Sequence, residues 1–142
     1  MSEELTDYQK VEELLEEYRE INIDIEGLEY QIKIEGIKGI SYTDMPGTPL
    51  PSNKSSVEQE LIKLDLLKSD MLALEIKKEG IDRVLKLLNE FENKLIKYIY
   101  FDKLKYKEIE NKLNMSKSGI VYNRDKLIND KLIKYFYKFN LI

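Results

Sequence analysis

The residues with the clearest chemical potential are polar and basic side chains between Lys105 and Ile128, where two short helical patterns meet at a turn. Asn114 lies at the turn, where a residue that tolerates left-handed backbone angles is needed. Ser116 follows, and serine is a favourable N-cap for the second helix. Four hydrophobic residues lie at the spacing that joins two helices crossing at a steep angle: Ile109, Leu113, Met115 and Ile120. The segment therefore predicts a helix-turn-helix.

The exposed face of the second helix presents side chains that can read DNA. Lys117, Ser118 and Tyr122, with Asp125 on the same face, can reach base edges in a major groove. A second set can contact phosphates, which gives affinity and register but no sequence information: Lys105, Lys107, Lys112, Ser116, Arg124 and Lys126. An ordinary helical hairpin with a solvated face is the alternative interpretation.

The composition excludes most common catalytic sites. The chain has 142 residues and contains neither cysteine nor histidine, so disulfides, thiolate metal sites and histidine-based catalysis or metal binding are ruled out. No spacing of the remaining carboxylate, serine and lysine residues suggests a paired catalytic arrangement. We therefore expect no enzymatic activity, no cofactor and no metal. The acidic start lacks an apolar signal region, and no apolar run is long enough to span a membrane, so we expect a cytoplasmic protein.

Charge is distributed unevenly along the chain. Residues 1–88 contain 11 Lys and Arg against 20 Asp and Glu, a net charge of −9. Residues 89–142 contain 12 Lys and Arg against 7 Asp and Glu, a net charge of +5. A basic half that coincides with the helix-turn-helix is the pattern expected where a polyanion docks. The acidic half should point away from the duplex or serve another partner.

The first segment, residues 1–35, contains a heptad pattern. Its hydrophobic seam recurs at alternating spacings of three and four residues: Val11, Leu14, Tyr18, Ile21, Ile25, Leu28 and Ile32. A narrow seam of this kind needs one partner helix. That partner is either a second copy of the chain, giving a homodimer, or a later helix of the same chain.

The remaining boundaries follow from helix breakers and caps. Residues 36–55 are predicted to form a linker, because they contain Pro46, Pro49 and Pro51. Residues 56–88 are predicted to form a central helix that is apolar on more than one side and that breaks at Gly80. Residues 89–142 form the DNA-binding domain, and Asn89 opens its first helix. The predicted fold is all-α: a long helical hairpin (about 5–32 against about 56–78) that could form a coiled coil, and a C-terminal helix-turn-helix unit of three or four helices.

The stretch from Leu88 to Leu127 resembles the region-4 helix-turn-helix of bacterial sigma factors. In that pattern an apolar helix ends in an aromatic pair, here Tyr100–Phe101. An E-I dipeptide follows in the first helix, here Glu108–Ile109, and an S-x-S element opens the recognition helix, here Ser116–Ser118. The resemblance implies a sigma-70 region 4-like DNA-binding unit.

The whole chain resembles small phage late-gene transcriptional regulators of the ArpU/RinA type, in size, in its helical N-terminal segment and in a Y-x-D-M-P element at Tyr42–Pro46. The resemblance implies a sequence-specific regulator of transcription, a phage or prophage late-gene activator in the bacterial host cell. Double-stranded DNA, and RNA polymerase through the acidic half, are the implied partners. Two alternatives stay open: a small terminase-like DNA-packaging subunit, and a helical protein-interaction module of the anti-sigma type.

Overall fold

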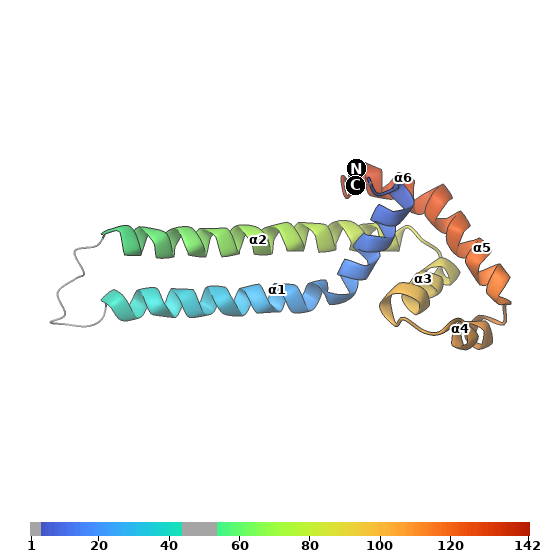
Figure 1. The fold of residues 1–142 in the computed structure, drawn as a ribbon, viewed down its shortest axis with the longest axis horizontal. Coiled ribbons are helices and arrows are strands. Elements are labelled where there is room, and N and C mark those ends of the chain that lie inside the picture. Colours follow the sequence, from blue (N-terminus) through green and yellow to red (C-terminus); the bar gives the residue numbers. More distant parts are fainter. Residues whose placement is uncertain (1–3, 44–53) are drawn as a thin grey trace. The chain divides into compact units, whose positions relative to one another are not determined.

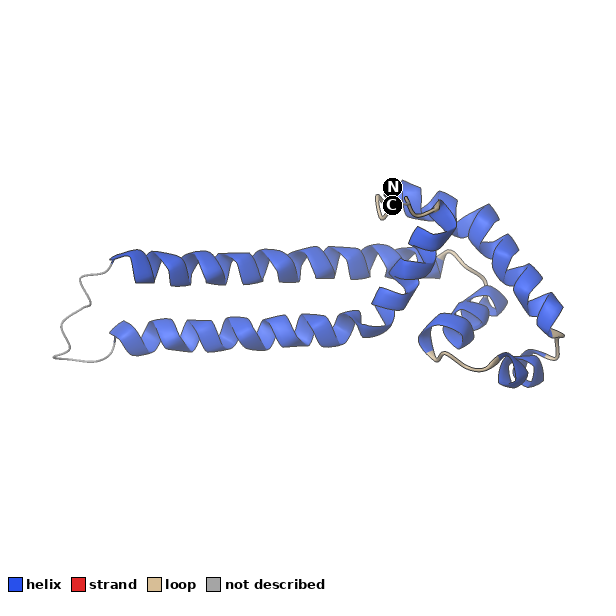
Figure 2. Cartoon of the chain, in the orientation of Figure 1, coloured by secondary structure: helices blue, strands red, loops and turns tan. Residues whose placement is uncertain are grey.

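The computed structural model describes residues 4–43 and 54–142, and the fold is all-α, with no strand in these two ranges (Figures 1 and 2). Two long helices come first, and short helices follow. The helices are α1 (Asp7–Thr43), α2 (Lys54–Lys86), α3 (Glu90–Ile96), α4 (Tyr106–Leu113), α5 (Lys117–Leu127) and α6 (Ile133–Lys138). Two π-helical turns, Lys97–Phe101 and Ile128–Leu132, extend α3 and join α5 to α6. The predicted fold class is confirmed.

The chain divides into two compact units. The first, here called the terminal unit, contains the described residues up to Glu20 together with Lys77–Ile142. The second, the distal unit, is Ile21–Ile76. The predicted division at residue 89 therefore does not match the packing, because the first turns of α1 and the last turns of α2 belong with the C-terminal helices. Hydrophobic residues at both ends of the chain bury one another, and local sequence patterns do not contain that information.

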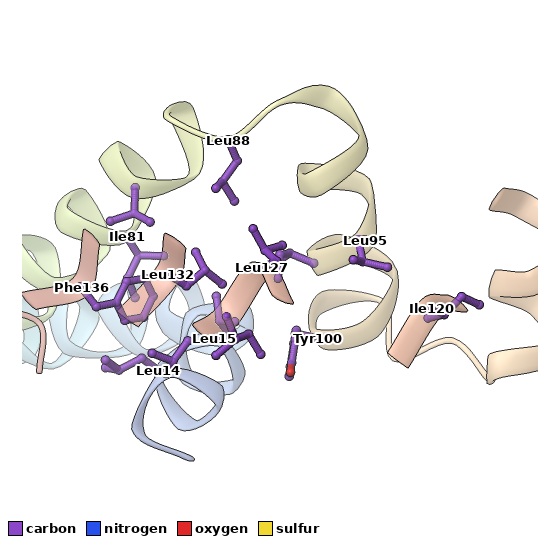
Figure 3. Packing of buried hydrophobic residues seen from close by; sticks show 14 of the residues in the cluster. Leu14, Leu15, Ile81, Leu88, Leu95, Tyr100, Ile120, Leu127, Leu132 and Phe136 are labelled. Atoms are coloured by element: carbon purple, nitrogen blue, oxygen red, sulfur yellow. The ribbon is translucent and has the colours of Figure 1, made fainter. Parts of the chain in front are cut away.

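The core of the terminal unit takes residues from each of the helices α1 to α6 (Figure 3). Val11 and Leu15 come from α1, and Ile81 and Val84 come from α2. The C-terminal contribution to this core is buried in the same way: Leu95, Ile96, Tyr100, Ile109, Ile120, Leu127, Ile128, Leu132 and Phe136. The end of the chain packs onto this core through Leu132 and Phe136, which have no exposed area.

Polar contacts fasten α1 to the rest of the terminal unit. The Tyr100 hydroxyl donates to Glu12 Oε2 at 2.8 Å, and the Tyr18 hydroxyl donates to Asp82. Lys103 Nζ forms an ion pair with Glu16 at 2.6 Å. Part of the acidic surface of α1 is thus neutralised inside this unit, and the first residues of the heptad seam, including Val11, pack within the chain.

The distal unit is a pair of helical segments with little buried surface. The ion pair between Lys63 Nζ and Glu35 Oε1, at 3.1 Å, joins α2 to α1. The later seam residues Ile25, Leu28 and Ile32 are only partly buried, and among residues 21–37 and 57–76 Ile21 alone is buried. The predicted helical hairpin is present, but the two helices bury few side chains between them in this unit.

The predicted start of the linker differs from the structure, as does the predicted break at Gly80. Helix α1 continues to Thr43, although the linker was predicted to begin at residue 36. Glycine in a helix costs about 1 kcal/mol relative to alanine, so Gly36 and Gly39 do not suffice to end the helix. Residues 44–53, which include the three prolines and most of the Y-x-D-M-P element, lie outside the described residues.

Gly80 does not break α2, which runs through it to Lys86. A Cβ atom at this position would lie 3.0 Å from Leu141 Cδ2. The glycine therefore permits the close approach of the C-terminal segment to α2. A sequence pattern shows that a glycine is present but not which neighbour requires it.

The predicted start of α3 is confirmed. Asn89 Oδ1 accepts a hydrogen bond from the Glu92 backbone amide at 2.8 Å, and Glu92 Oε1 accepts one from the Asn89 amide at 3.0 Å. This reciprocal capping box fixes the first turn of the helix that leads into the helix-turn-helix.

Candidate nucleic-acid interface

Helices α4 and α5 form a helix-turn-helix pair with the predicted turn. Asn114 adopts the left-handed conformation, with φ 52° and ψ 45°, and ends α4. Ser116 caps α5, and its Oγ accepts a hydrogen bond from the Gly119 amide at 3.2 Å. Ile109 and Ile120 are buried between the helices, and Leu113 and Met115 pack against the same core. These contacts fix the crossing of the two helices and direct one face of α5 outward.

The three predicted base-contacting residues lie on the exposed side of α5. Lys117 and Ser118 are exposed in its first turn, and 64% of the Tyr122 side chain is exposed one turn later. Ser118 Oγ lies 3.1 Å from Ser116 Oγ. Lys117 Nζ lies 5.2 Å from the centre of the Tyr106 ring, which orients the ammonium group at the N-terminus of the helix. This arrangement presents polar groups at the end of a helix that a major groove can accommodate.

Five of the predicted phosphate contacts are exposed on the same pair of helices. They are Lys105, Lys107, Lys112, Ser116 and Lys126. None of the four lysines forms an ion pair within the described part of the chain. By contrast, Lys94, Lys97 and Lys131 are paired with carboxylates of residues 89–142, and Lys103 is paired with Glu16 of α1. Lysines without an internal partner are free to contact an anion.

Two of these lysines have particular surroundings. Lys112 Nζ lies 5.7 Å from the centre of the Tyr98 ring. Lys126 lines a shallow groove of about 320 Å³ between α3 and α5, together with Asn89, Phe91 and Asn123. Lys126 therefore lies toward α3, one helical turn beyond Tyr122 on α5.

Arg124 differs from the other predicted phosphate contacts because its guanidinium group is engaged inside the protein. Its Nη1 donates to the Tyr106 hydroxyl at 2.8 Å, and its Nε and Nη2 donate to Asp125 Oδ1 at 3.1 and 3.0 Å. Only 21% of the side chain is exposed. We therefore reassign Arg124 from phosphate binding to positioning α5.

Tyr8 completes this network and was not identified from the sequence. Its hydroxyl donates to Asp125 Oδ1 at 2.6 Å, across 117 residues of sequence. The hydrogen bond from Tyr8, assisted by Arg124, lowers the pKa of Asp125 below its ordinary value, so this carboxylate stays charged. No local pattern pairs a tyrosine at the start of α1 with the recognition helix, because the contact depends on the folding of the two chain ends.

The fold and this site define an all-α protein with a helix-turn-helix pair in a mixed N- and C-terminal unit. The chain belongs to a family described as "Protein of unknown function (DUF722)", whose model matches residues 7–132. That match covers both long helices and the helix-turn-helix. The searches of curated proteins and of solved structures gave no match.

The described residues offer neither a membrane-spanning helix nor a metal site. Within residues 4–43 and 54–142, no helix is both long enough and apolar enough to cross a membrane. In the same residues, no three His, Cys, Asp or Glu side chains are grouped so that they could hold a metal ion. The exposed faces of α4 and α5 remain the strongest candidate site.

Proposed function

We propose that this protein binds double-stranded DNA sequence-specifically and regulates transcription, with α5 as the recognition helix. Lys117, Ser118 and Tyr122 contact base edges, and Lys105, Lys107, Lys112, Ser116 and Lys126 contact phosphates. The resemblance to ArpU/RinA-type regulators extends the proposal to phage or prophage late genes in a bacterial cytoplasm. RNA polymerase is then the partner for the acidic surface that the terminal unit leaves free.

One observation carries the proposal: the lysines of α4 and α5 are exposed and form no ion pair with a carboxylate of the residues that the structure describes, on a helix pair whose turn and cap are well formed. Phosphate contacts of this kind supply affinity for DNA of any sequence. The exposed polar groups on the first two turns of α5 supply the groups that distinguish one base pair from another.

The test begins with selection of preferred duplexes from a random pool by the purified full chain, followed by footprinting of the best site. Lys117→Ala or Tyr122→Ala should then weaken binding to that site by about 1–3 kcal/mol and should flatten the sequence preference. Both side chains are exposed, so neither change should alter folding, which circular dichroism checks.

The matched control is a lysine assigned to phosphate. Lys105→Ala should weaken binding to the selected site and to random DNA alike, and should reduce the slope of log K against log salt by roughly 0.9. Equal losses on selected and random DNA for Lys117→Ala would remove α5 from base recognition. An absence of salt-dependent DNA binding by the wild-type chain would instead favour a protein-interaction module.

A further inference from the structure

Helix α2 has two apolar faces in the distal unit, and among the described residues only one of these faces has a partner. The half-buried residues Leu64, Leu67, Met71 and Leu74 recur at spacings of three and four. The ion pair of the neighbouring Lys63 with Glu35 of α1 indicates that this face is directed toward α1. A second series with the same spacing lies on the opposite side of α2 and is exposed throughout: Gln59, Ile62, Leu66, Ser69, Ala73 and Ile76. We call this second series the outward stripe.

The outward stripe is more apolar than a solvated helix face requires. The side chains of Ile62, Leu66 and Ile76 are 58%, 60% and 61% exposed. Leu61 and Leu72 beside them are 57% and 56% exposed. A helix that is apolar on two opposite sides is normally contacted from both. The inner face is itself only half covered, so the two helical segments do not bury enough surface to form a core alone.

We propose that a second copy of this chain packs antiparallel against the outward stripe, so that the protein is a homodimer through α2. Knobs-into-holes packing of two antiparallel helices places Leu66 of one copy opposite Ser69 of the second copy and Ile62 opposite Ala73. Large residues then meet small ones along the interface, and Leu61 and Leu72 lie at its edge. This surface differs from the heptad seam of α1, whose first residues are buried within the chain.

The charges beside the stripe favour this register. In it, Lys63 of each copy, which also forms an ion pair with Glu35 of its own chain, lies opposite Asp70 of the other copy, so two pairs of opposite charge arise by symmetry. A shift by one heptad would place Lys63 opposite Lys77 and Asp70 opposite Asp70. A parallel arrangement would place Asp65 opposite Asp70. Opposite charges therefore select the antiparallel pairing, and like charges disfavour these competing arrangements.

The proposed dimer interface is separate from the proposed DNA-binding face, so dimerisation is tested on the full chain without nucleic acid. Sedimentation equilibrium should give a dimer with a dissociation constant on the order of micromolar. Asp70→Lys brings like charges together and should raise that constant about tenfold or more, and the double change Lys63→Asp with Asp70→Lys should restore it. Leu66→Asp should give a monomer with unchanged helix content.

The matched control is Ile23→Asp, because Ile23 is as exposed as the stripe residues but lies on α1. It should leave the dimer intact. A wild-type monomer at about 100 µM, an unchanged dissociation constant for Asp70→Lys, or dissociation by Ile23→Asp would each overturn the proposal.

The absence of cysteine from the sequence allows a direct test of direction. A mixture of Ile62→Cys and Ala73→Cys chains should form mainly the mixed disulfide on mild oxidation. Predominant cross-linking of Ile62→Cys chains to one another would indicate parallel packing and would contradict the antiparallel interface.

Discussion

At the scale of single residues, the notable feature is a hydrogen-bonded network that holds the recognition helix. Arg124 donates to both Tyr106 and Asp125, and Tyr8 donates to the same carboxylate. Hydrogen bonds that involve charged groups are stronger than neutral ones. The network therefore connects α1, α4 and α5 and fixes the orientation of the face that carries Tyr122.

Arg124→Ala should lower the free energy of unfolding by about 1–2 kcal/mol, because three donors to partly buried acceptors are lost. Arg124→Lys should recover little of this, since an ammonium group cannot replace the planar fork. Urea denaturation measures both effects. Arg83→Ala is the matched control: its ion pair with Glu79 is exposed, so the loss should stay below about 0.5 kcal/mol.

The same variant tests the reassignment of Arg124. If Arg124 positions α5 and does not contact phosphate, Arg124→Ala should leave the salt slope of DNA binding unchanged. A reduction of that slope by roughly 0.9, as expected for Lys105→Ala, would show that the arginine contacts phosphate after all.

Two tyrosines make stability depend on alkaline pH. Burial, with the hydrogen bond to Asp125, raises the pKa of Tyr8 to about 12, and burial, with the hydrogen bond to Asp82, raises the pKa of Tyr18 to about 12. The unfolded chain releases these protons near pH 10, whereas the folded chain retains them to about pH 12. Their contribution to stability is therefore complete below the unfolded pKa and is lost as the pH rises through the folded pKa.

The measurement compares urea denaturation of the wild-type chain and of Tyr8→Phe/Tyr18→Phe across this range. The two proteins share every other ionisable group, so the difference between the two curves isolates the two tyrosines. The wild type should lose more stability between pH 10 and 12 than the double variant. Parallel curves would contradict the raised pKa values.

At the scale of secondary-structure elements, the geometry of the helix-turn-helix depends on two backbone positions. Asn114 supplies the left-handed residue that ends α4, and Ser116 supplies the oxygen that caps α5. Both residues act through their own backbone or through the next turn, so their roles follow from residue type and position. This locality explains why the turn and both caps of the site were predicted correctly.

Replacement of Asn114 tests this dependence. Asn114→Val should lower the free energy of unfolding by about 1–2 kcal/mol, because a β-branched residue is strained at positive φ. Asn114→Gly has no such strain and should stay close to the wild-type value. Thermal denaturation monitored by circular dichroism measures the stability of both variants. Equal stability of the two would contradict the left-handed backbone conformation of residue 114.

At the scale of the whole molecule, the terminal unit is built from both ends of the chain. Val11 and Leu15 of α1 and Ile81 and Val84 of α2 have no exposed side-chain area, and they lie in one cluster with Ile120 and Phe136. The helix-turn-helix therefore depends on α1 and α2 for part of its core. The start of α1 therefore has two roles. Its hydrophobic residues complete the core of the terminal unit, and its acidic residues form a charged surface.

A fragment of residues 89–142 should consequently fail to fold cooperatively, because these core positions of α1 and α2 would be missing. The full chain with Leu15→Ala should fold but lose about 2–5 kcal/mol of stability, the usual effect of removing a fully buried leucine side chain. Amide proton dispersion in NMR spectra checks the fragment, and urea denaturation checks the variant. A fragment with a sharp unfolding transition would support an independent domain at residue 89.

The sequence by itself determined the features that depend on neighbouring residues. The all-α class, the capping box at Asn89, the turn at Asn114 and the exposed face with Tyr122 all follow from periodicity and local hydrogen bonding. Only the tertiary structure decided which partner each surface takes. It buried Val11 within the chain, engaged Arg124 with Tyr8 through Asp125 and left the outward stripe of α2 uncovered. These outcomes depend on contacts between residues far apart in sequence, and a one-dimensional pattern specifies that a face needs a partner without specifying which one.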